Sequence, residues 1–452
     1  MRITSSFGVE IRKPNSCIHQ TMKIYRAAVG YLIRVLDSVW EELDVIKNPL
    51  EQFNTAEHMV HNTKDNRARF DFDRLFYKMP SYLRRSAIQS ALGSLSSYHT
   101  NLEIWEERRA CAAGAGKAVS GEGRPVLAEE PHAMPVFYHD IMYQEGEAGS
   151  DTARLKLYNG HDWVWKEVRL LHTDMEYIRK HWSGKKASAP TLEKRRKKFY
   201  LRFSYTEAVS LSKVPAEEQT ACAVDLGINT DAVCTIMQSD GTVLARKFIS
   251  FPSEKDRLKH VLGRISRFQR EHAGSRCPGL WSYAVRLNDE LSIMTARAIT
   301  AFAAEHGADV IIFEHLDMQG RVHGSNKQRL HMWKKRDVQK RCEHMAHRKG
   351  MRISRVCAWN TSRLAYDGSG KVKRDPENHS LCRFDKGKQY NCDLSASYNI
   401  GARYFIRERI KPLPATVRSL LEAKVPAVKR RTSCVYADLL AFDSVIRGLY
   451  TA

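Results

Sequence analysis

Three acidic residues stand where an apolar segment ends or a helix should begin. They are Asp225 in Ala-Val-Asp-Leu-Gly-Ile-Asn, Glu314 in Val-Ile-Ile-Phe-Glu-His-Leu and Asp393 in Asn-Cys-Asp-Leu-Ser-Ala-Ser. An acid next to an apolar run is costly to bury unless it is paired or binds a metal. Mg²⁺ prefers oxygen ligands, and two such ions can stabilise both the attacking and the leaving oxygen of a phosphodiester displacement. The three acids therefore predict a hydrolytic site in which they are both the catalytic residues and the ligands of two Mg²⁺ ions.

Each acid taken singly has a simpler interpretation. An isolated Asp or Glu is more often a surface residue, and Asp393 could be the N-cap of the helix expected there. His315 follows Glu314 directly and would point to the opposite face of a strand, so we assign it no role. The order Asp, Glu, Asp, with all three acids at the ends of elements, favours a metal site over three separate explanations.

The charge of the chain limits its partners. Lys and Arg number 73 against 51 Asp and Glu in 452 residues, which gives a formal net charge of +22. Such a surplus favours a polyanion, and nucleic acid above all, as the partner. A basic enzyme acting on something else is the alternative interpretation.

The sequence lacks the usual features of membrane and secreted proteins. No run approaches 18 apolar residues, so we expect no membrane partner. The N-terminal Met-Arg-Ile-Thr-Ser-Ser-Phe lacks the apolar segment of a secretory signal. The 10 cysteines form no Cys-x-x-Cys pair, which fits a reducing compartment. We therefore expect a cytoplasmic protein of a prokaryotic cell, associated with the nucleoid.

The first part of the chain combines helical and β-rich segments. Residues 1–12 predict a strand, and apolar residues at spacings of three and four over 18–43 predict a long helix. A second helix should begin at Ser81, and 111–125 has the composition of a linker. From about residue 132 the pattern favours strands and turns.

The second part predicts a different layout. Three strands over 220–228, 232–238 and 243–250 form a meander, followed by helices over 254–272 and 284–306. A strand over 309–314, a basic helix over 328–349 and a strand over 351–358 complete the pattern. A meander followed by alternating helices and strands, with acids at strand ends, is typical of an RNase H-like nuclease.

Basic residues gather on two helices, at the start of a third and in a predicted hairpin turn. Such clusters can bind a phosphate backbone, although the solvated face of a helix or turn has the same composition. The candidate nucleic-acid contacts are Arg84, Arg85, Lys194, Arg195, Arg196, Lys197, Lys198, Lys259, Arg264, Arg267, Arg270, Lys334, Lys335 and Arg336.

The sequence resembles TnpB proteins and compact type V CRISPR effectors in three motifs of their RuvC nuclease domain. These are Asp225-Leu-Gly-Ile-Asn, Glu314-His-Leu and Asp393-x-x-Ala-x-x-Asn399-Ile400. The segments His331-Met-Trp333 and Ala358-Trp-Asn-Thr361-Ser362-Arg363 are similar to the part of the family before its zinc-binding insert. The match covers about 220–403, and the rest agrees in outline only.

The resemblance implies an α/β multidomain protein with three kinds of domain. A β-rich, barrel-like wedge domain would comprise 1–14 and 130–216, and a helical recognition domain with a linker would comprise 15–129. A RuvC-like nuclease domain would comprise 217–358 and 393–452. The remaining segment, 359–392, would be a target-loading insert.

The resemblance also implies an activity and partners. The protein would be an RNA-guided, Mg²⁺-dependent endodeoxyribonuclease that holds a guide RNA and cleaves double- or single-stranded target DNA paired with it. It would act as a monomer or as a homodimer on one guide. The sequence does not distinguish a CRISPR origin from a transposon origin.

The insert departs from the family pattern. Ala365 and Gly368 replace the first expected cysteine pair, and Asp385 replaces the partner of Cys382. Four thiolates therefore cannot form a tetrahedral zinc site, and we expect no zinc. An irregular site built from Cys357, His379, Cys382 and Cys392 is the alternative, and otherwise the insert should be held by its own packing.

Two other functions are consistent with parts of the pattern. One is an RNA-guided DNA-binding protein that acts mainly by occupying its target, with weak or no cleavage. The other is a transposase or junction resolvase that needs no RNA. DDE transposases order their acids Asp, Asp, Glu, and a resolvase would not need the first 220 residues, so we favour the nuclease.

Overall fold

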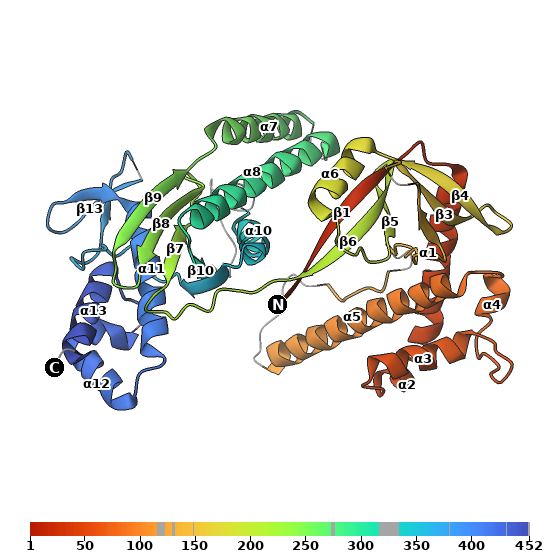
Figure 1. Ribbon diagram of the computed structural model, residues 1–452, viewed down its shortest axis with the longest axis horizontal. Coiled ribbons are helices and arrows are strands. Elements are labelled where there is room, and N and C mark those ends of the chain that lie inside the picture. The colour runs from red at the N-terminus through yellow and green to blue at the C-terminus, as the bar shows by residue number, and fades with distance from the viewer. Residues whose placement is uncertain are drawn as a thin grey trace. The chain divides into compact units, whose positions relative to one another are not determined.

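The computed structural model describes residues 1–114, 123–128, 132–147, 149–272, 276–315, 334–378, 380–430 and 432–450. The chain forms two compact units, Arg2–Glu207 and Ala208–Ala452, and Met1 belongs to the second. We call them the N-terminal unit and the C-terminal unit (Figure 1). Among the residues described, none of the helices combines the length and apolarity that a bilayer crossing requires. The finer division into four parts stays a prediction.

An open six-stranded sheet forms the β part of the N-terminal unit, in the order β2-β3-β4-β1-β6-β5. The expectation of a barrel-like sheet is therefore wrong. The edge strands β2 and β5 have only 3 and 5 residues, so they offer little length for the pairing that closes a barrel. The strands are β1 (Arg2–Arg12), β2 (Tyr143–Glu145), β3 (Thr152–Tyr158), β4 (Trp163–Leu170), β5 (Thr191–Arg195) and β6 (Lys198–Ala208).

The apolar stripe predicted over 18–43 belongs to two helices, because α1 ends at Asp37 and α2 begins at Trp40. The hydroxyl of Ser38 donates to the carbonyl oxygen of Val35 at 2.7 Å, a local bond that competes with helix continuation. The residues of the stripe are buried in the core of the unit. The helices are α1 (Ser16–Asp37), α2 (Trp40–Asp44), α3 (Pro49–Val60), α4 (Phe72–Leu75), α5 (Ser81–Gly114) and α6 (His172–Trp182).

The second predicted helix is confirmed as α5, which begins at Ser81. The helix continues through Gly114 and so includes the first residues of the predicted linker. Residues 115–122 of that linker lie outside the described part of the chain. The phenol oxygen of Tyr25 and the hydroxyl oxygen of Ser86 lie 2.7 Å apart and connect α1 with α5 inside the core.

A five-stranded sheet forms the centre of the C-terminal unit, in the order β11-β10-β7-β8-β9. The first three strands along the chain form an antiparallel meander, and β10 runs parallel to both β7 and β11. The five predicted strands are confirmed. They are β7 (Thr220–Asp225), β8 (Ala232–Gln238), β9 (Val243–Ile249), β10 (Val310–His315) and β11 (Arg352–Cys357).

Helices cover both faces of this sheet, because alternate residues of its strands face opposite cores. Cys222 and Val224 belong to the core shared with α8 and α10, whereas Ala221 and Ala223 belong to the core shared with α11 and α13. The helices are α7 (Pro252–Glu271), α8 (Pro278–Glu305), α10 (Lys335–Arg348), α11 (Cys392–Ile410), α12 (Ala415–Lys424) and α13 (Tyr436–Tyr450), with a 3₁₀ helix η1 (Pro426–Arg430). Residues 316–333, which include the start of the basic helix predicted over 328–349, lie outside the described residues.

Helix α11 lies very close to the sheet. A Cβ added at Gly401 would lie 3.0 Å from the Sδ of Met237 and 3.3 Å from the Cβ of Ala223. The hydroxyl oxygens of Ser397 and Thr235 lie 2.6 Å apart in the same interface. The small residues on the helix after Asp393 therefore allow α11 to approach the sheet this closely.

Aromatic rings hold the insert (359–392) against α11. The ring of Tyr366 lies 5.6 Å from that of Phe384, 5.0 Å from that of Tyr390 and 5.2 Å from that of Tyr398 on α11, measured between centroids. Cys382 and Cys392 are buried beneath these rings in one small core. The insert contains a three-stranded sheet of β12 (Lys373–Arg374), β13 (Leu381–Arg383) and β14 (Gln389–Asn391).

Candidate active site

The fold brings Asp225 and Glu314 to the same edge of the central sheet. Asp225 is the last residue of β7, and Glu314 follows Phe313, which pairs with Val224 in the parallel register of β10 and β7. Both carboxylates are buried, with exposures of 9% and 7%. Two parallel neighbouring strands that end together therefore present two acids side by side.

Asp393 reaches the same place from α11, which packs on β7 and β8. It lies in the first turn of the helix but is not its N-cap. The side chain of Asn391 has that role and accepts a hydrogen bond from the backbone N–H of Leu394 at 2.9 Å. The carboxylate of Asp393 is therefore not used in capping, which removes the simplest alternative explanation of this residue.

Electrostatics connects the three acids. Burial raises the pKa of Asp225 well above its ordinary value, and the negative charges of Glu314 and Asp393 raise it further. Burial also raises the pKa of Asp393. The guanidinium of Arg374 on β12 opposes the rise in pKa at both aspartates. We call Asp225, Glu314 and Asp393 the acid cluster, since the charges of the other two raise the pKa of Asp225.

Glu314 has direct hydrogen-bonding support. The hydroxyl of Thr361 donates to its Oε1, and the side-chain amide of Gln339 on α10 donates to its backbone oxygen at 3.0 Å. Burial raises the pKa of Glu314, while the bond from Thr361 and the charges of Arg403 and Lys335 oppose that rise. The carboxylate is thus held in one orientation by a buried neutral donor with two cations nearby.

The loop that carries Thr361 is fixed from α11. The side-chain amide of Asn399 donates to the carbonyl oxygens of Thr361 at 3.0 Å and Leu364 at 2.9 Å. The guanidinium of Arg403 donates to the carbonyl oxygens of Cys357 at 2.7 Å and Trp359 at 2.8 Å. Both side chains are almost fully buried, so the helix that supplies Asp393 also positions the donor to Glu314.

The donor set of the acid cluster fits Mg²⁺. Three carboxylates are hard oxygen donors, and a divalent cation would offset the mutual repulsion that raises the pKa of Asp225. As the side chains stand, no three His, Cys, Asp or Glu residues in the described ranges are grouped closely enough to hold a metal ion. The three carboxylates would have to move closer together to share one.

Sequence reasoning did not assign functions to three residues that lie near these acids. Thr361 contacts Glu314 directly, while Arg374 and Arg403 act on the cluster through their charges. Lys335, predicted from the sequence as a nucleic-acid contact, also acts on Glu314 through its charge. Thr361 stands 47 positions after its partner, so spacing alone gives no signal for the contact. Its occurrence in the Thr-Ser segment of the family resemblance was the available hint.

Several of the basic residues predicted to contact nucleic acid in the N-terminal unit form ion pairs with acidic side chains. Arg84 is buried, with 8% exposure, and lies 3.5 Å from a carboxylate oxygen of Glu57. Arg85 lies 3.7 Å from the other oxygen of the same carboxylate. The predicted hairpin 194–198 connects β5 to β6, and there Arg195 pairs with Glu193 at 2.5 Å and Lys198 with Glu10 at 2.7 Å. Arg196 and Lys197 form the exposed turn of that hairpin.

The basic candidates of the C-terminal unit lie on α7 and at the start of α10. Helix α7 buries Leu258, Val261 and Ile265 on one face and exposes its basic residues on the other, which are Lys259, Arg264, Arg267 and Arg270. Lys334 pairs with Asp289, Lys335 is buried and Arg336 is exposed. The exposed side of α7 is therefore the most continuous basic surface among the candidates in this unit.

Comparisons with known proteins identify the fold class. The chain has the fold seen in the complex of Cas12f1 with a single-guide RNA and target DNA, with a TM-score of 0.50, 14% identity and coverage of 85% of this chain and 81% of that one. It also matches the mini-RNA-guided endonuclease CRISPR-Cas_phi3, with a TM-score of 0.52, 12% identity and coverage of 91% and 93%. The resemblance to compact type V effectors is thereby confirmed at the level of fold.

Sequence comparisons add one partial match. The family model described as the Aq_aa04 family matches residues 5–159, within the N-terminal unit and outside the acid cluster. None of the curated proteins matches the chain.

Proposed function

We propose that the protein is an RNA-guided DNA endonuclease whose acid cluster hydrolyses phosphodiester bonds with Mg²⁺. The observation that carries the proposal is the electrostatic coupling of Asp225 to Glu314 and Asp393, three acids from separate parts of the chain. Asp225 and Glu314 are buried at one edge of the sheet, and Asp393 is half-buried. Holding three like charges together with two of them buried is costly, so such a cluster is favoured where a cation is bound for a function. The sheet order, a meander followed by two parallel strands, supports an RNase H-like nuclease core of the RuvC type.

The chain supplies ligands, orientation and charge to the reaction. Mg²⁺, when bound by the three carboxylates, would activate water and stabilise the departing oxygen of the phosphodiester. Thr361 keeps the carboxylate of Glu314 in place through its hydrogen bond. Arg374 brings a positive charge to the side of Asp225 and Asp393, where it can attract the DNA phosphate.

The proposed partners are a guide RNA and a DNA target. The two similar structures are described as an RNA-guided endonuclease and as a complex with single-guide RNA and target DNA, and this chain covers more than four fifths of each. The net charge of +22 favours the same kind of partner. By this proposal base pairing selects the target, while the N-terminal unit holds RNA and contacts DNA. The protein would act in the cytoplasm, as one copy or two copies per guide.

The first test identifies the RNA. The protein would be expressed with its native flanking DNA, purified, and its bound small RNA sequenced. A defined RNA with a constant scaffold and a variable segment is expected, and repeat-derived segments would indicate a CRISPR origin. Random degraded RNA alone would contradict guidance by RNA and favour a stand-alone DNA-processing nuclease.

The second test separates cutting from binding. With the guide known, DNA carrying its target should be cleaved in Mg²⁺ by the natural protein and left intact by Asp225→Ala. The competing function, target binding with little cleavage, has one observation in its favour, since no three acids in the described residues are spaced for a metal. Interference with a target plasmid that survives Asp225→Ala unchanged would favour that function.

A further inference from the structure

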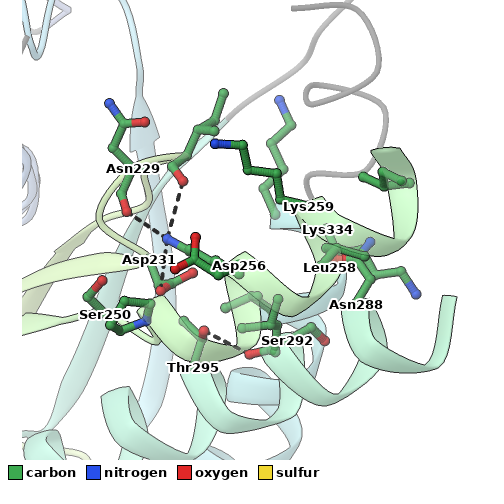
Figure 2. Close-up of a pocket in the computed structure, with 18 of the residues that line it drawn as sticks. Asn229, Asp231, Ser250, Asp256, Leu258, Lys259, Asn288, Ser292, Thr295 and Lys334 are labelled. Carbon is green, nitrogen blue, oxygen red and sulfur yellow. Dashed lines mark hydrogen bonds and ion pairs between the residues drawn. The ribbon is translucent and has the colours of Figure 1, made fainter. Parts of the chain in front are cut away.

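Two features of the C-terminal unit are not used by the proposed mechanism. One is a cavity of about 680 Å³, whose wall includes Leu226, the residue after Asp225. It lies between the loop after β7, helices α7 and α8, and the start of α10 (Figure 2). Several polar side chains of its wall are already engaged with acids, namely Lys255 with Asp231, Lys334 with Asp289 and Ser292 with Asp337. We therefore assign this cavity no ligand.

The other feature is the side chain of Trp359, which is 68% exposed. Every other tryptophan in the described part of the chain is buried or half-buried. Single exposed apolar residues are common on protein surfaces, but the indole is the largest of the aromatic side chains and leaves correspondingly more apolar surface in water. What this ring can do depends on where it lies and how it is held.

Trp359 lies at the edge of the sheet that carries the acids. Val356 of β11 is the partner of Glu314 in the parallel register of β10 and β11, and Trp359 follows it by three residues. The ring therefore comes directly after the carboxyl end of a parallel strand, the edge at which open α/β sheets bind their ligands. Two residues further on, Thr361 donates to the carboxylate of Glu314.

The backbone around Trp359 is held in one conformation. Its carbonyl oxygen accepts a hydrogen bond from the guanidinium of Arg403 at 2.8 Å, and Arg403 is itself buried. Asn360 has a left-handed backbone with φ of 59°, and its carbonyl oxygen accepts from the N–H groups of Arg363 at 3.2 Å and Leu364 at 3.1 Å. An aromatic side chain on a fixed backbone loses little conformational freedom when it binds a partner.

Exposed basic residues adjoin the loop that carries the ring. The carbonyl oxygen of Arg363 accepts from the N–H of Val372 at 2.9 Å, so Arg363 lies beside the segment with Lys371 and Lys373, and all three basic side chains are exposed. Arg374 comes next, and its charge reaches both aspartates of the acid cluster. These charges disfavour a cationic ligand for the ring and favour an aromatic group carried on an anion.

We propose that the ring of Trp359 stacks on an unpaired base of the DNA strand that is cut at the acid cluster. A nucleobase is an aromatic group on a phosphate backbone, so it fits both the ring and the basic residues beside it. Stacking tolerates any sequence, because every base has a π face, and this suits a nuclease whose target is chosen by pairing with RNA. The inference rests on the proposed function, since that function supplies the strand.

The experiment measures stacking by the full chain in EDTA, where no cleavage occurs. The probe is a short single-stranded DNA that carries one fluorescent aminopurine, whose emission falls when the base stacks. We expect the natural protein to quench the probe and Trp359→Ala to lose most of the quenching. The dissociation constant should rise about tenfold in the variant, as expected for one stacked base. No quenching by the natural protein, or equal quenching by Trp359→Ala, would overturn the proposal.

Two further substitutions at the same position identify the cause. Trp359→Phe keeps an aromatic face and should recover most of the quenching. Trp359→Leu keeps an apolar side chain without a π face and should behave like Trp359→Ala, and it keeps the test decisive if the alanine variant does not fold. Binding and quenching by Trp359→Leu equal to those of the natural protein would mean that apolar contact suffices, which overturns stacking.

The matched control is Phe248→Ala. Phe248 is an aromatic residue with 51% exposure on β9, the edge strand on the other side of the same sheet. Its loss should leave the dissociation constant within about twofold of the natural value, since a base stacked on one ring gains nothing from another at a distant edge. A drop equal to that of Trp359→Ala would mean that any exposed ring contributes, and would overturn the specific role of Trp359.

Two additional measurements separate stacking from charge and DNA from RNA. The indole carries no charge, so the logarithm of the dissociation constant should depend on the logarithm of the salt concentration with the same slope in Trp359→Ala and in the natural protein. A shallower slope in the variant would mean lost phosphate contacts and would contradict stacking. Quenching of an RNA probe but not of the DNA probe of the same sequence would assign the ring to RNA and overturn the proposal.

Failure of this inference is distinguishable from failure of the proposed nuclease. If guide-matched DNA is cut while Trp359→Ala quenches the probe as the natural protein does, the stacking role fails and the nuclease stands. If quenching depends on Trp359 and no guide yields cleavage, the nuclease proposal fails and the stacking site stands.

Discussion

The hydroxyl of Thr361 donates a hydrogen bond to Oε1 of Glu314, and both side chains are buried at the same edge of the central sheet. The same hydroxyl oxygen lies 3.1 Å from the carbonyl oxygen of Ala358, so its one hydrogen has two acceptors in reach. The loop after β11 thus orients an acid at the end of β10. Thr361 is a positioning residue, because it touches a proposed metal ligand rather than the substrate.

Thr361→Val should slow DNA cleavage by about tenfold to a hundredfold. The substitution keeps the shape of the side chain and removes the donor, and a hydrogen bond to a charged group is worth about 1.5–3 kcal/mol. Thr361→Ser keeps the hydroxyl and should recover most of the rate. The measurement is the single-turnover cleavage rate of guide-matched DNA across a range of Mg²⁺ concentrations.

A positioning role and a purely structural role give different results in that titration. If Thr361 orients a ligand, Thr361→Val should need more Mg²⁺ for half of its maximal rate, with a melting temperature close to that of the natural protein. An unchanged Mg²⁺ requirement together with a large drop in melting temperature would mean that the residue only supports the fold.

Asp225→Asn should stabilise the metal-free protein while abolishing cleavage. The carboxylate of Asp225 is buried beside two other negative charges, and the amide removes that repulsion at nearly the same volume. A gain of about 1–2 kcal/mol, typical of a single substitution, corresponds to about 2–8 °C in the melting temperature of a unit of this size. Thermal unfolding in EDTA measures the effect.

The matched control for this prediction is Asp256→Asn. Asp256 is an exposed aspartate on α7 in the same unit, outside the acid cluster, so its substitution should shift the melting temperature little. Adding Mg²⁺ should stabilise the natural protein more than Asp225→Asn. If Asp225→Asn instead melts at a lower temperature than the natural protein, the carboxylate of Asp225 stabilises the metal-free fold through its neighbours. The prediction that its charge destabilises the fold would then be wrong.

The sequence predicted the strands of the C-terminal unit and the position of the acids because both depend on local patterns. The apolar run before Glu314 and the small residues after Asp393 are readable one segment at a time. Contacts between distant segments were not readable in this way. Arg374 comes from the insert to the acids, which depends on how the chain folds back. The cap of α11 is local, but Asn391 and Asp393 are both good capping residues, so the pattern alone did not decide between them.

Less of the structure of the N-terminal unit could be predicted from its sequence, for a related reason. The apolar spacing over 18–43 fits one helix, yet Ser38 bonds back to Val35 and the helix ends there. A barrel and an open sheet have the same alternation of residues along each strand, so strand patterns alone did not distinguish them. The cavity beside Asp225 was also unpredicted, because its walls come from four separate segments.

Asn399→Ala should destabilise the protein by about 2–4 kcal/mol. Asn399 is fully buried and its amide donates to two carbonyl oxygens, while its Oδ1 accepts from the backbone N–H of Tyr436 at 3.0 Å. Its loss leaves buried groups without partners, each costing about 1–3 kcal/mol. Chemical denaturation measures the change. Asn229→Ala, a substitution of a residue on the loop after β7, is the control and should cost much less.

Removal of zinc should leave the insert folded, whereas loss of one aromatic ring should not. A high-affinity zinc chelator is expected to shift the melting temperature of the natural protein by less than about 1 °C, because Tyr366, Phe384, Tyr390 and Tyr398 pack the insert on α11. Tyr366→Ala removes the ring that contacts the other three. Because Tyr366 is partly buried, the loss should cost about 2–3 kcal/mol, less than the usual range for a fully buried aromatic residue.

The folding of the insert can be measured locally by proteolysis, in addition to the melting temperature of the whole protein. Limited proteolysis followed by mass spectrometry should find new cleavage within 359–392 in Tyr366→Ala and none in chelator-treated natural protein. The control is Tyr283→Ala on α8, an aromatic residue with 36% exposure outside the insert, which should leave the insert resistant. Cleavage of the insert after chelation alone would mean that a metal, rather than the aromatic rings, holds it, and an irregular site including Cys382 and Cys392 would then be the leading explanation.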